Sequence, residues 1–294
     1  MSIVWIRRYG LGKTLIRESW DNASKGYRDG LGSQLHPVAI RLASLLPDTL
    51  PGPVLDLACG PGTVLFYLSR KRKGVKGIAC DFSIEMGKLA RERNPGVKTV
   101  VADQDCLPFR EGSLGAVVSS MGTIFSSDHG SQLKMISKTL MDGGFLGFSA
   151  WGEKKDCALR RVSEEITKKW PHSTPEAVPS LDSPFALGGS DWLGRASSEA
   201  GLEVLKVESG DLIFDFQNIS EAAHSLVHTG RFALLLKNHQ EWLEPLTSLA
   251  CEHFYPYQET SGRVRLSNRF HLFVLQKKSM GKSSDYPVAA SGVR

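Results

Sequence analysis

The chain has 294 residues, five cysteines and a formal net charge of +5 at pH 7. This mild charge does not require a nucleic-acid partner. No run reaches the ~18 apolar residues of a membrane helix. The cysteine count is odd and no C-x-x-C pair is present, which argues against a disulfide framework or a zinc site. We therefore expect a soluble, cytoplasmic protein without a bound metal or a membrane span, either a monomer or a homodimer.

The first half of the chain alternates between strand and helix patterns. Residues 14–46 predict helical structure, and prolines then interrupt the chain before the first strand. The predicted strands and helices that follow are strand 54–58, helix 63–70, strand 75–80, helix 84–93, strand 98–102, strand 116–120, a helix carrying Leu133, Ile136 and Leu140, and strand 145–150. This alternation predicts a parallel sheet with helices on both faces.

The second half is less regular. A helical face formed by Leu159, Val162, Ile166 and Trp170 precedes a proline-rich loop. The later predicted elements are helix 191–200, extended stretches 202–207 and 212–216, helical patterns over 219–254, and strands 264–266 and 269–276. Residues 277–294 are polar, and we expect them to form a flexible tail.

A glycine-rich turn and a later acid carry the main functional signal. Residues 54–62 read V-L-D-L-A-C-G-P-G, and Asp81 follows Gly60 by 21 residues at the end of a second apolar run. An acid about 20 residues beyond such a turn holds a ribose hydroxyl, so we expect an adenosine ligand. Leu65 replaces the third glycine of a dinucleotide fingerprint, which makes a nicotinamide oxidoreductase a weaker alternative. Asp56 could attract an ammonium group.

Five segments in order resemble class I S-adenosylmethionine (SAM) methyltransferases. Besides the glycine turn, they are I-A-C-D-F-S-I-E-M at 78–86, V-V-A-D-Q-D-C-L-P-F at 100–109, L-G-A-V-V-S-S-M-G at 114–122 and D-G-G-F-L-G-F-S-A-W at 142–151. The chain looks most similar to the small-molecule subgroup of ubiquinone and menaquinone biosynthesis (methyltransferase type 11). One departure is Leu114-Gly115, where the family usually has an aromatic residue and an acid.

The resemblance implies an α/β fold with a doubly wound, Rossmann-like sheet of seven strands, the last antiparallel, and a helical lid insertion. Residues 1–276 would form a single domain. Its expected parts are an N-terminal helical arm (1–50), a SAM-binding core (51–151) and a substrate-side lid with strand six (152–262), followed by the tail (277–294).

The resemblance also implies which residues bind SAM and its product S-adenosylhomocysteine (SAH). They are Tyr27, Asp56, Ala58, Gly60, Pro61, Gly62, Asp81, Phe82, Met86, Asp103, Gln104, Ser120 and Met121. Asp81 would accept from both ribose hydroxyls, and Asp103 from the adenine amino group. The alternatives are a plain strand–helix turn at the glycines, a helix N-cap for Asp81, a loop acid for Asp103 and core packing for Tyr27.

Within the expected adenine site, the backbone N–H of Gln104 would meet a ring nitrogen, while Phe82 and Met86 would pack on the ring. Ser120 and Met121 would lie near the methyl group. Tyr27 belongs to an arm that would cover the cofactor.

Methyl transfer from a sulfonium is an in-line displacement that we expect to be driven mainly by proximity and orientation. His228, His224 and His129 are the candidate bases, and a surface or packing role is the alternative for each. Large apolar residues of the second half would partly wall a pocket for an aromatic or lipophilic small molecule: Trp192, Phe214, Phe216, Phe232, Leu235, Trp242, Phe254, Tyr255 and Tyr257.

We expect methylation of this acceptor at oxygen or carbon. The first alternative is a nucleic-acid or protein methyltransferase, although no N-P-P-Y or D-P-P-Y segment follows the fourth strand. The second is a SAM-binding protein that does not methylate, such as a cyclase or a regulator.

The sequence contains a basic run at 69–76, for which we favour a solvated helix end over a phosphate-binding site.

Overall fold

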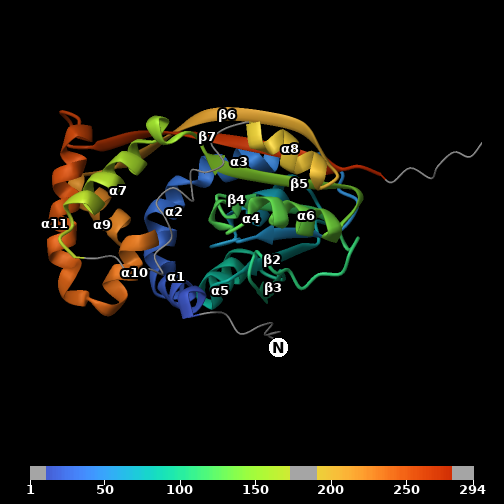
Figure 1. Cartoon of the computed structure of the whole chain (residues 1–294), viewed down its shortest axis with the longest axis horizontal. Helices are drawn as coiled ribbons and strands as arrows, with labels where there is room; N and C mark the ends of the chain where they lie inside the picture. Colours follow the sequence, from blue (N-terminus) through green and yellow to red (C-terminus); the bar gives the residue numbers. More distant parts are fainter. Residues whose placement is uncertain (1–10, 173–190, 280–294) are drawn as a thin grey trace, which may run out of the picture.

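One mixed sheet of seven strands organises the computed structural model, which describes residues 11–172 and 191–279 (Figure 1). The strands are β1 (Val54–Leu57), β2 (Gly77–Asp81), β3 (Lys98–Val101), β4 (Leu114–Ser120), β5 (Leu140–Trp151), β6 (Leu202–Phe216) and β7 (Val264–Lys277). They lie in the order β3-β2-β1-β4-β5-β7-β6, and β7 is antiparallel to both of its neighbours. The predicted doubly wound sheet with an antiparallel last strand is therefore confirmed.

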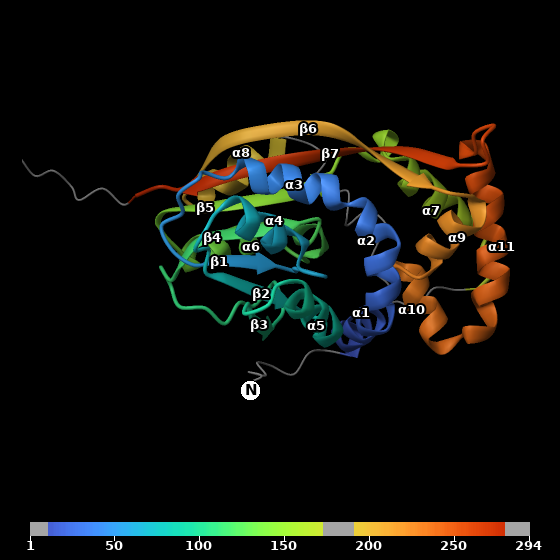
Figure 2. The ribbon, with the colours of Figure 1, turned by 180° about the vertical axis from the view of Figure 1, so that it is seen from behind.

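Some of the helices flank this sheet on both faces, and the others stand at one end of it. The described helices are α1 (Leu11–Asp29), α2 (Leu31–Gln34), α3 (His36–Leu45), α4 (Thr63–Lys71), α5 (Ile84–Arg93), α6 (His129–Thr139), α7 (Ala158–Lys169), α8 (Asp191–Glu199), α9 (Ile219–Val227), α10 (Gly230–Asn238) and α11 (Leu243–Phe254). Helices α3, α4 and α5 cover one face, and α6 and α8 cover the other (Figures 1 and 2). The flanking helices leave the carboxyl ends of the parallel strands accessible to a ligand.

A helical cluster stands at one end of the molecule. Helices α7, α9, α10 and α11 pack together there, and α1 and α2 lie between them and the central sheet (Figures 1 and 2). The insertion predicted between strands six and seven is thus present as α9–α11, with α7 added from an earlier part of the chain.

The last two strands are longer than the sequence pattern predicts. The stretches 202–207 and 212–216 are one strand, β6, and 264–266 and 269–276 are one strand, β7. The two strands pair antiparallel from Leu202 opposite Lys277 to Phe216 opposite Val264. This ladder shifts register once, between Val204 and Lys206, and it includes the polar positions between the apolar stretches, which local hydrophobicity alone marks as breaks.

The predicted helical region 14–46 is divided at Gly30 and again before Pro37, which occupies the first turn of α3, where its missing N–H costs nothing. Leu140 begins β5 and does not end α6, because its backbone is extended. The proline loop falls partly at 173–190 and the tail mainly at 280–294, both outside the described residues.

Arg72 has a structural role within the basic run at 69–76. Its buried guanidinium donates from Nε to the carbonyl of Pro47 at 2.8 Å and from Nη1 to that of Ala43 at 3.0 Å, and it also bonds the carbonyl of Leu46. These acceptors include backbone carbonyls in the last turn of α3, which have no hydrogen-bond partner within the helix. The prediction of a solvated helix end is therefore wrong for Arg72.

Candidate functional site

A cavity of about 540 Å³ lies at the carboxyl ends of the parallel strands, with α1 forming one wall. All the predicted cofactor residues except Gly62 line it: Tyr27, Asp56, Ala58, Gly60, Pro61, Asp81, Phe82, Met86, Asp103, Gln104, Ser120 and Met121. Gly62 is the N-cap of α4 with a φ of +74°, and a Cβ there would lie 2.6 Å from the side-chain amide nitrogen of Asn94. Glycine is needed at that position for the turn and for close packing.

Asp81 is fixed by backbone groups on both of its oxygens. The N–H of Gly60 donates to Oδ2 and the N–H of Ser83 to Oδ1, each at 2.8 Å. Burial raises the pKa of Asp81 to about 6, and the N–H bonds from Ser83 and Gly60 partly oppose that rise. Ser83 is the N-cap of α5, accepting from the N–H of Met86, so Asp81 is not the cap of this helix.

Asp56 presents an unpaired carboxylate oxygen beside Asp81. Its Oδ2 accepts from the N–H of Leu65 at 3.3 Å, and no described residue bonds Oδ1. Burial raises the pKa of Asp56 well above its ordinary value, and the Asp81 charge adds to that rise. A buried acceptor without a partner is costly, so this oxygen suits a ligand that brings a cationic or donor group.

Two strand ends hold non-glycine residues in the left-handed region. Ala58, after β1, has a φ of +51°, and Met121, after β4, has a φ of +57°. The N–H of Met121 donates to the hydroxyl of Ser149 at 2.9 Å, and the Ser119 hydroxyl accepts from the N–H of Thr123 at 3.1 Å. Such strained backbone persists where the surrounding structure fixes it and is concentrated at functional sites.

Asp103 lies in the cavity wall just beyond β3, but it is already paired. The ammonium of Lys13, from α1, lies 2.5 Å from Asp103 Oδ2 and 3.3 Å from Asp105 Oδ2. The sequence interpretation did not identify Lys13 or Asp105 as site residues. The position of Asp105 two residues after Asp103 was the sequence signal available for Asp105. No local pattern indicates that Lys13 contacts Asp103, which lies 90 residues later in the chain.

Gln104 connects the two loops at this edge of the cavity. When its side-chain amide is oriented so that both the NH₂ and the oxygen have hydrogen-bond partners, the NH₂ donates to the carbonyl of Gly122 at 3.1 Å and the oxygen accepts from the N–H of Ser126 at 3.2 Å. The side chain of Gln104 therefore fixes the loop after β4, and its backbone is the part that remains for a ligand.

The N-terminal arm supplies part of the aromatic wall of the cavity. Trp20 lies edge to face with Tyr27 at 5.4 Å and with Phe125 of η1 (Thr123–Phe125) at 6.0 Å between ring centroids. Burial and the Asp81 charge raise the pKa of Tyr27 to about 12, so its hydroxyl stays neutral. Ile16, Trp20 and Tyr27 share one face of α1 at helical spacing, a signal that the sequence interpretation did not use.

The expected apolar wall from the second half of the chain is not found. Trp192, Phe214, Phe216, Phe232, Leu235, Trp242, Phe254, Tyr255 and Tyr257 are all absent from the cavity lining. Instead, Phe216 packs edge to face with Phe214 and Phe254, with centroids 6.3 and 6.4 Å away. This part of the prediction is wrong. Phe214, Phe216 and Phe254 are buried in the core between β6 and the helical cluster. Trp192 of α8 lies against His129 of α6, and Tyr255 is exposed.

The three candidate histidines do not line the cavity. His224 of α9 and His228, the C-cap of that helix, have ring centroids 4.1 Å apart, and burial together with His228 lowers the pKa of His224. His129 begins α6 beside Trp192, where burial lowers its pKa. The geometry gives no support to a histidine base, and the catalytic assignment stays a prediction.

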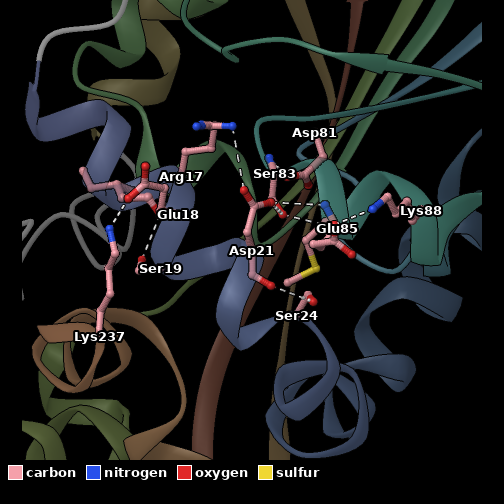
Figure 3. Close-up of polar contacts among 12 residues, drawn as sticks. Arg17, Glu18, Ser19, Asp21, Ser24, Asp81, Ser83, Glu85, Lys88 and Lys237 are labelled. Atoms are coloured by element: carbon pink, nitrogen blue, oxygen red, sulfur yellow. Dashed lines mark hydrogen bonds and ion pairs between the residues drawn. The ribbon is translucent and has the colours of Figure 1, made fainter. Parts of the chain in front are cut away.

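Helix α1 is fastened to the core and to the helical cluster. Figure 3 shows Asp21 bonded to Ser83 and Glu85 at the start of α5, and Glu18 paired with Lys237 of α10. The same helix supplies Lys13, Trp20 and Tyr27 to the cavity. The arm is therefore both a wall of the site and the link between the two parts of the molecule.

Comparison with known proteins agrees with this architecture. Residues 54–144 match the family described as "Methyltransferase domain". A chain from the Haloferax volcanii complex of the Trm112 methyltransferase activator superposes with a TM-score of 0.58 at 18% identity, covering 90% of this chain and 99% of that one. The chain therefore has the fold of that solved structure, and its residues 54–144 are similar to a methyltransferase domain.

The relatives with known names are diverse. Malonyl-[acyl-carrier protein] O-methyltransferases from Dechloromonas aromatica and Pseudescherichia vulneris are 30% and 25% identical to the chain, over 52% and 75% of it and over 57% and 84% of their own lengths. A human mitochondrial arginine-hydroxylase is 28% identical over 60% of the chain and 49% of its own. The first relative is matched over little more than half its length, so its substrate does not transfer with the domain.

Metal-binding clusters and membrane-spanning helices are both absent from the described residues. No group of three or more His, Cys, Asp or Glu side chains in residues 11–172 and 191–279 could hold a metal ion. No helix in the described part of the chain is long and apolar enough to cross a membrane.

Proposed function

We propose that the cavity binds SAM and releases SAH. The unpaired Oδ1 of Asp56 fits the ammonium of the methionine part, directly or through a water molecule. Asp81 keeps lone pairs for the two ribose hydroxyls beyond the two N–H bonds that it accepts. The positive φ of Gly60 and the empty space around its Cα let the backbone approach the ligand closely. The bound group would supply an activated methyl group on sulfur.

We further propose that the methyl group goes to the oxygen or carbon of a small aromatic or lipophilic acceptor. The observation that carries this proposal is that one cavity holds both the carboxylates Asp56 and Asp81 and the aromatic trio Trp20, Tyr27 and Phe125. Aromatic walls bury a planar or apolar acceptor, and a few polar groups then orient it. With both reactants held in line, orientation supplies most of the rate enhancement.

Calorimetric titration with SAH tests the cofactor assignment. We expect micromolar-range binding by the wild-type protein and loss of binding in Asp81→Ala. Asp29→Ala is the matched control, because this carboxylate is exposed and pairs only with Arg28 among the described residues. A folded wild-type protein that does not bind SAH would overturn the proposal. Transfer of labelled methyl from SAM to a panel of phenols, quinols and carboxylic acids then tests the acceptor class.

A second candidate is a protein that binds SAM without transferring its methyl group. The observation in its favour is that no histidine lines the cavity among the described residues, and the pKa of Tyr27 is too high for that side chain to act as a base. The human relative has a similar sequence, yet its name gives a different reaction, arginine hydroxylation. Tight SAM binding with no SAH formed on any acceptor would favour this candidate.

A further inference from the structure

Lys13 and the adenine amino group would need the same oxygen. Asp103 Oδ1 already accepts from the backbone N–H of Asp105 at 2.9 Å, so Oδ2 is the oxygen available to a ligand donor. That atom is the one that Lys13 holds at 2.5 Å. The two carboxylates raise the pKa of Lys13 more than burial lowers it, so the side chain is an ammonium. That oxygen keeps a second lone pair, but a charged donor bonds a carboxylate more strongly than a neutral amine does, so Lys13 weakens the amine bond unless another group compensates for its departure.

Asp105 supplies that compensation. It accepts from the hydroxyl of Ser126 at 2.6 Å and from the hydroxyl of Ser127 at 3.0 Å. Although burial opposes them, these bonds and the Lys13 charge lower its pKa, so Asp105 is ionised at neutral pH. Its carboxylate is therefore held in place whether or not Lys13 contacts it, and its Oδ2 is only 3.3 Å from the ammonium.

We infer that Lys13 moves from Asp103 to Asp105 when an adenosine ligand binds, and that Asp105 sets the affinity without touching the ligand. The side chain of Lys13 is 42% exposed, so this small shift needs no movement of the backbone of α1. Asp105 is thus a positioning residue for the adenine end of the site. This inference rests on the proposed function, since it requires that the cavity take SAM or SAH.

A double-mutant cycle with SAH titration tests the inference. We expect Asp105→Asn to weaken SAH binding about three- to tenfold, the size of one partly exposed charge-assisted bond. Lys13→Gln should bind SAH at least as tightly as the wild type, and adding Asp105→Asn to it should change nothing further. Lys25→Gln, an exposed lysine on the same helix, is the matched control and should leave the affinity unchanged.

S-inosylhomocysteine, which carries a carbonyl in place of the amino group, provides the second arm. Because it does not need Asp103 as an acceptor, Asp105→Asn should leave its affinity unchanged. Equal weakening by Asp105→Asn in both Lys13 backgrounds would overturn the inference, as would Lys13→Gln binding SAH more weakly than the wild type. If the wild-type protein bound neither ligand, the proposed function itself would fail, which is a different result from a cycle without coupling.

Discussion

Asp21, on the buried side of helix α1, accepts a hydrogen bond from the hydroxyl of Ser83 at 2.6 Å (Figure 3). The same oxygen, Oδ1, accepts from the N–H of Glu85 at 3.1 Å, so a residue 62 positions earlier helps to cap α5. Ser83 also donates its N–H to Asp81. The N-terminal arm is therefore fastened two residues from the carboxylate that we assign to the ribose.

Removing this fastening should loosen the arm. We expect Asp21→Ala to lower the free energy of unfolding by about 1–2 kcal/mol and to weaken SAH binding about 5- to 30-fold, since two donors lose a shared acceptor. Hydrogen exchange in α1 should accelerate while exchange in β1 and β4 stays slow. Asp29→Ala on the same helix is the control, and equal behaviour of the two variants would contradict this role for Asp21.

The ion pair between Glu18 of α1 and Lys237 of α10 should couple the arm to the helical cluster. The Lys237 bond lowers the pKa of Glu18, although burial opposes it. Because Glu18 is 40% exposed, we expect a coupling energy of only about 0.2–1 kcal/mol in a Glu18→Gln, Lys237→Met cycle measured by urea unfolding. The exchanged pair Glu18→Lys, Lys237→Glu should recover part of the loss. Additive single effects would show that the pair contributes nothing.

SAH affinity should depend on pH through Asp81. Burial raises its pKa to about 6, so the carboxylate that the ribose needs is lost as pH falls below that value. We expect affinity to fall by up to about tenfold per pH unit below pH 6 and to level off above pH 7. Folding responds oppositely, since a raised acid pKa favours the folded state more at low pH and the benefit is lost as pH rises through 6.

Calorimetry at pH 5, 6, 7 and 8 measures this dependence. The variant Asp81→Asn should lose the Asp81 part of it, although any contribution from Asp56 remains. A flat affinity profile of the wild type across this range would show that Asp81 does not bind the ligand as a carboxylate.

Ala58→Gly should stabilise the protein. Because Ala58 has a φ of +51°, glycine removes a steric cost of about 1–2 kcal/mol from the folded state. The greater conformational entropy of glycine in the unfolded chain offsets part of this, so we expect the free energy of unfolding to rise by about 0.5–1 kcal/mol. Ala79→Gly in the interior of β2, where φ is not positive, should destabilise instead. Urea midpoints that move in the same direction for both variants would contradict the strain at Ala58.

Gly122→Ala should be among the most damaging small substitutions near the site. The new Cβ would lie 2.5 Å from the Cβ of Ala58 and 2.7 Å from the hydroxyl of Ser119, so we expect a loss of about 1–3 kcal/mol in unfolding free energy. Combining it with Ala58→Gly removes the nearer clash and should restore part of the stability. Thermal unfolding of the two single variants and the double variant measures this, and strict additivity would be the contrary result.

Much of the core could be predicted because its signals are local. The predicted helix 84–93 agrees with α5 in both bounds, and the apolar runs of β1 and β4 are buried on both faces, so composition alone reveals them. The glycine turn and Asp81 are separated by one βα unit, whose length the fold fixes. The placement of the predicted cofactor residues around one cavity follows from this regularity.

The parts that were missed depend on contacts between distant segments. The pairing of β6 with β7 makes continuous strands from patterns that look interrupted, and the aromatic rings of the second half pack among themselves instead of facing the cavity. By itself, the sequence determined the sheet, the glycine turn and the acids at the strand ends, because hydrophobic periodicity and short-range spacing encode them. Only the tertiary structure decided that α1 supplies Trp20 and Lys13 to the site, since which helix covers a cavity depends on packing across the whole chain.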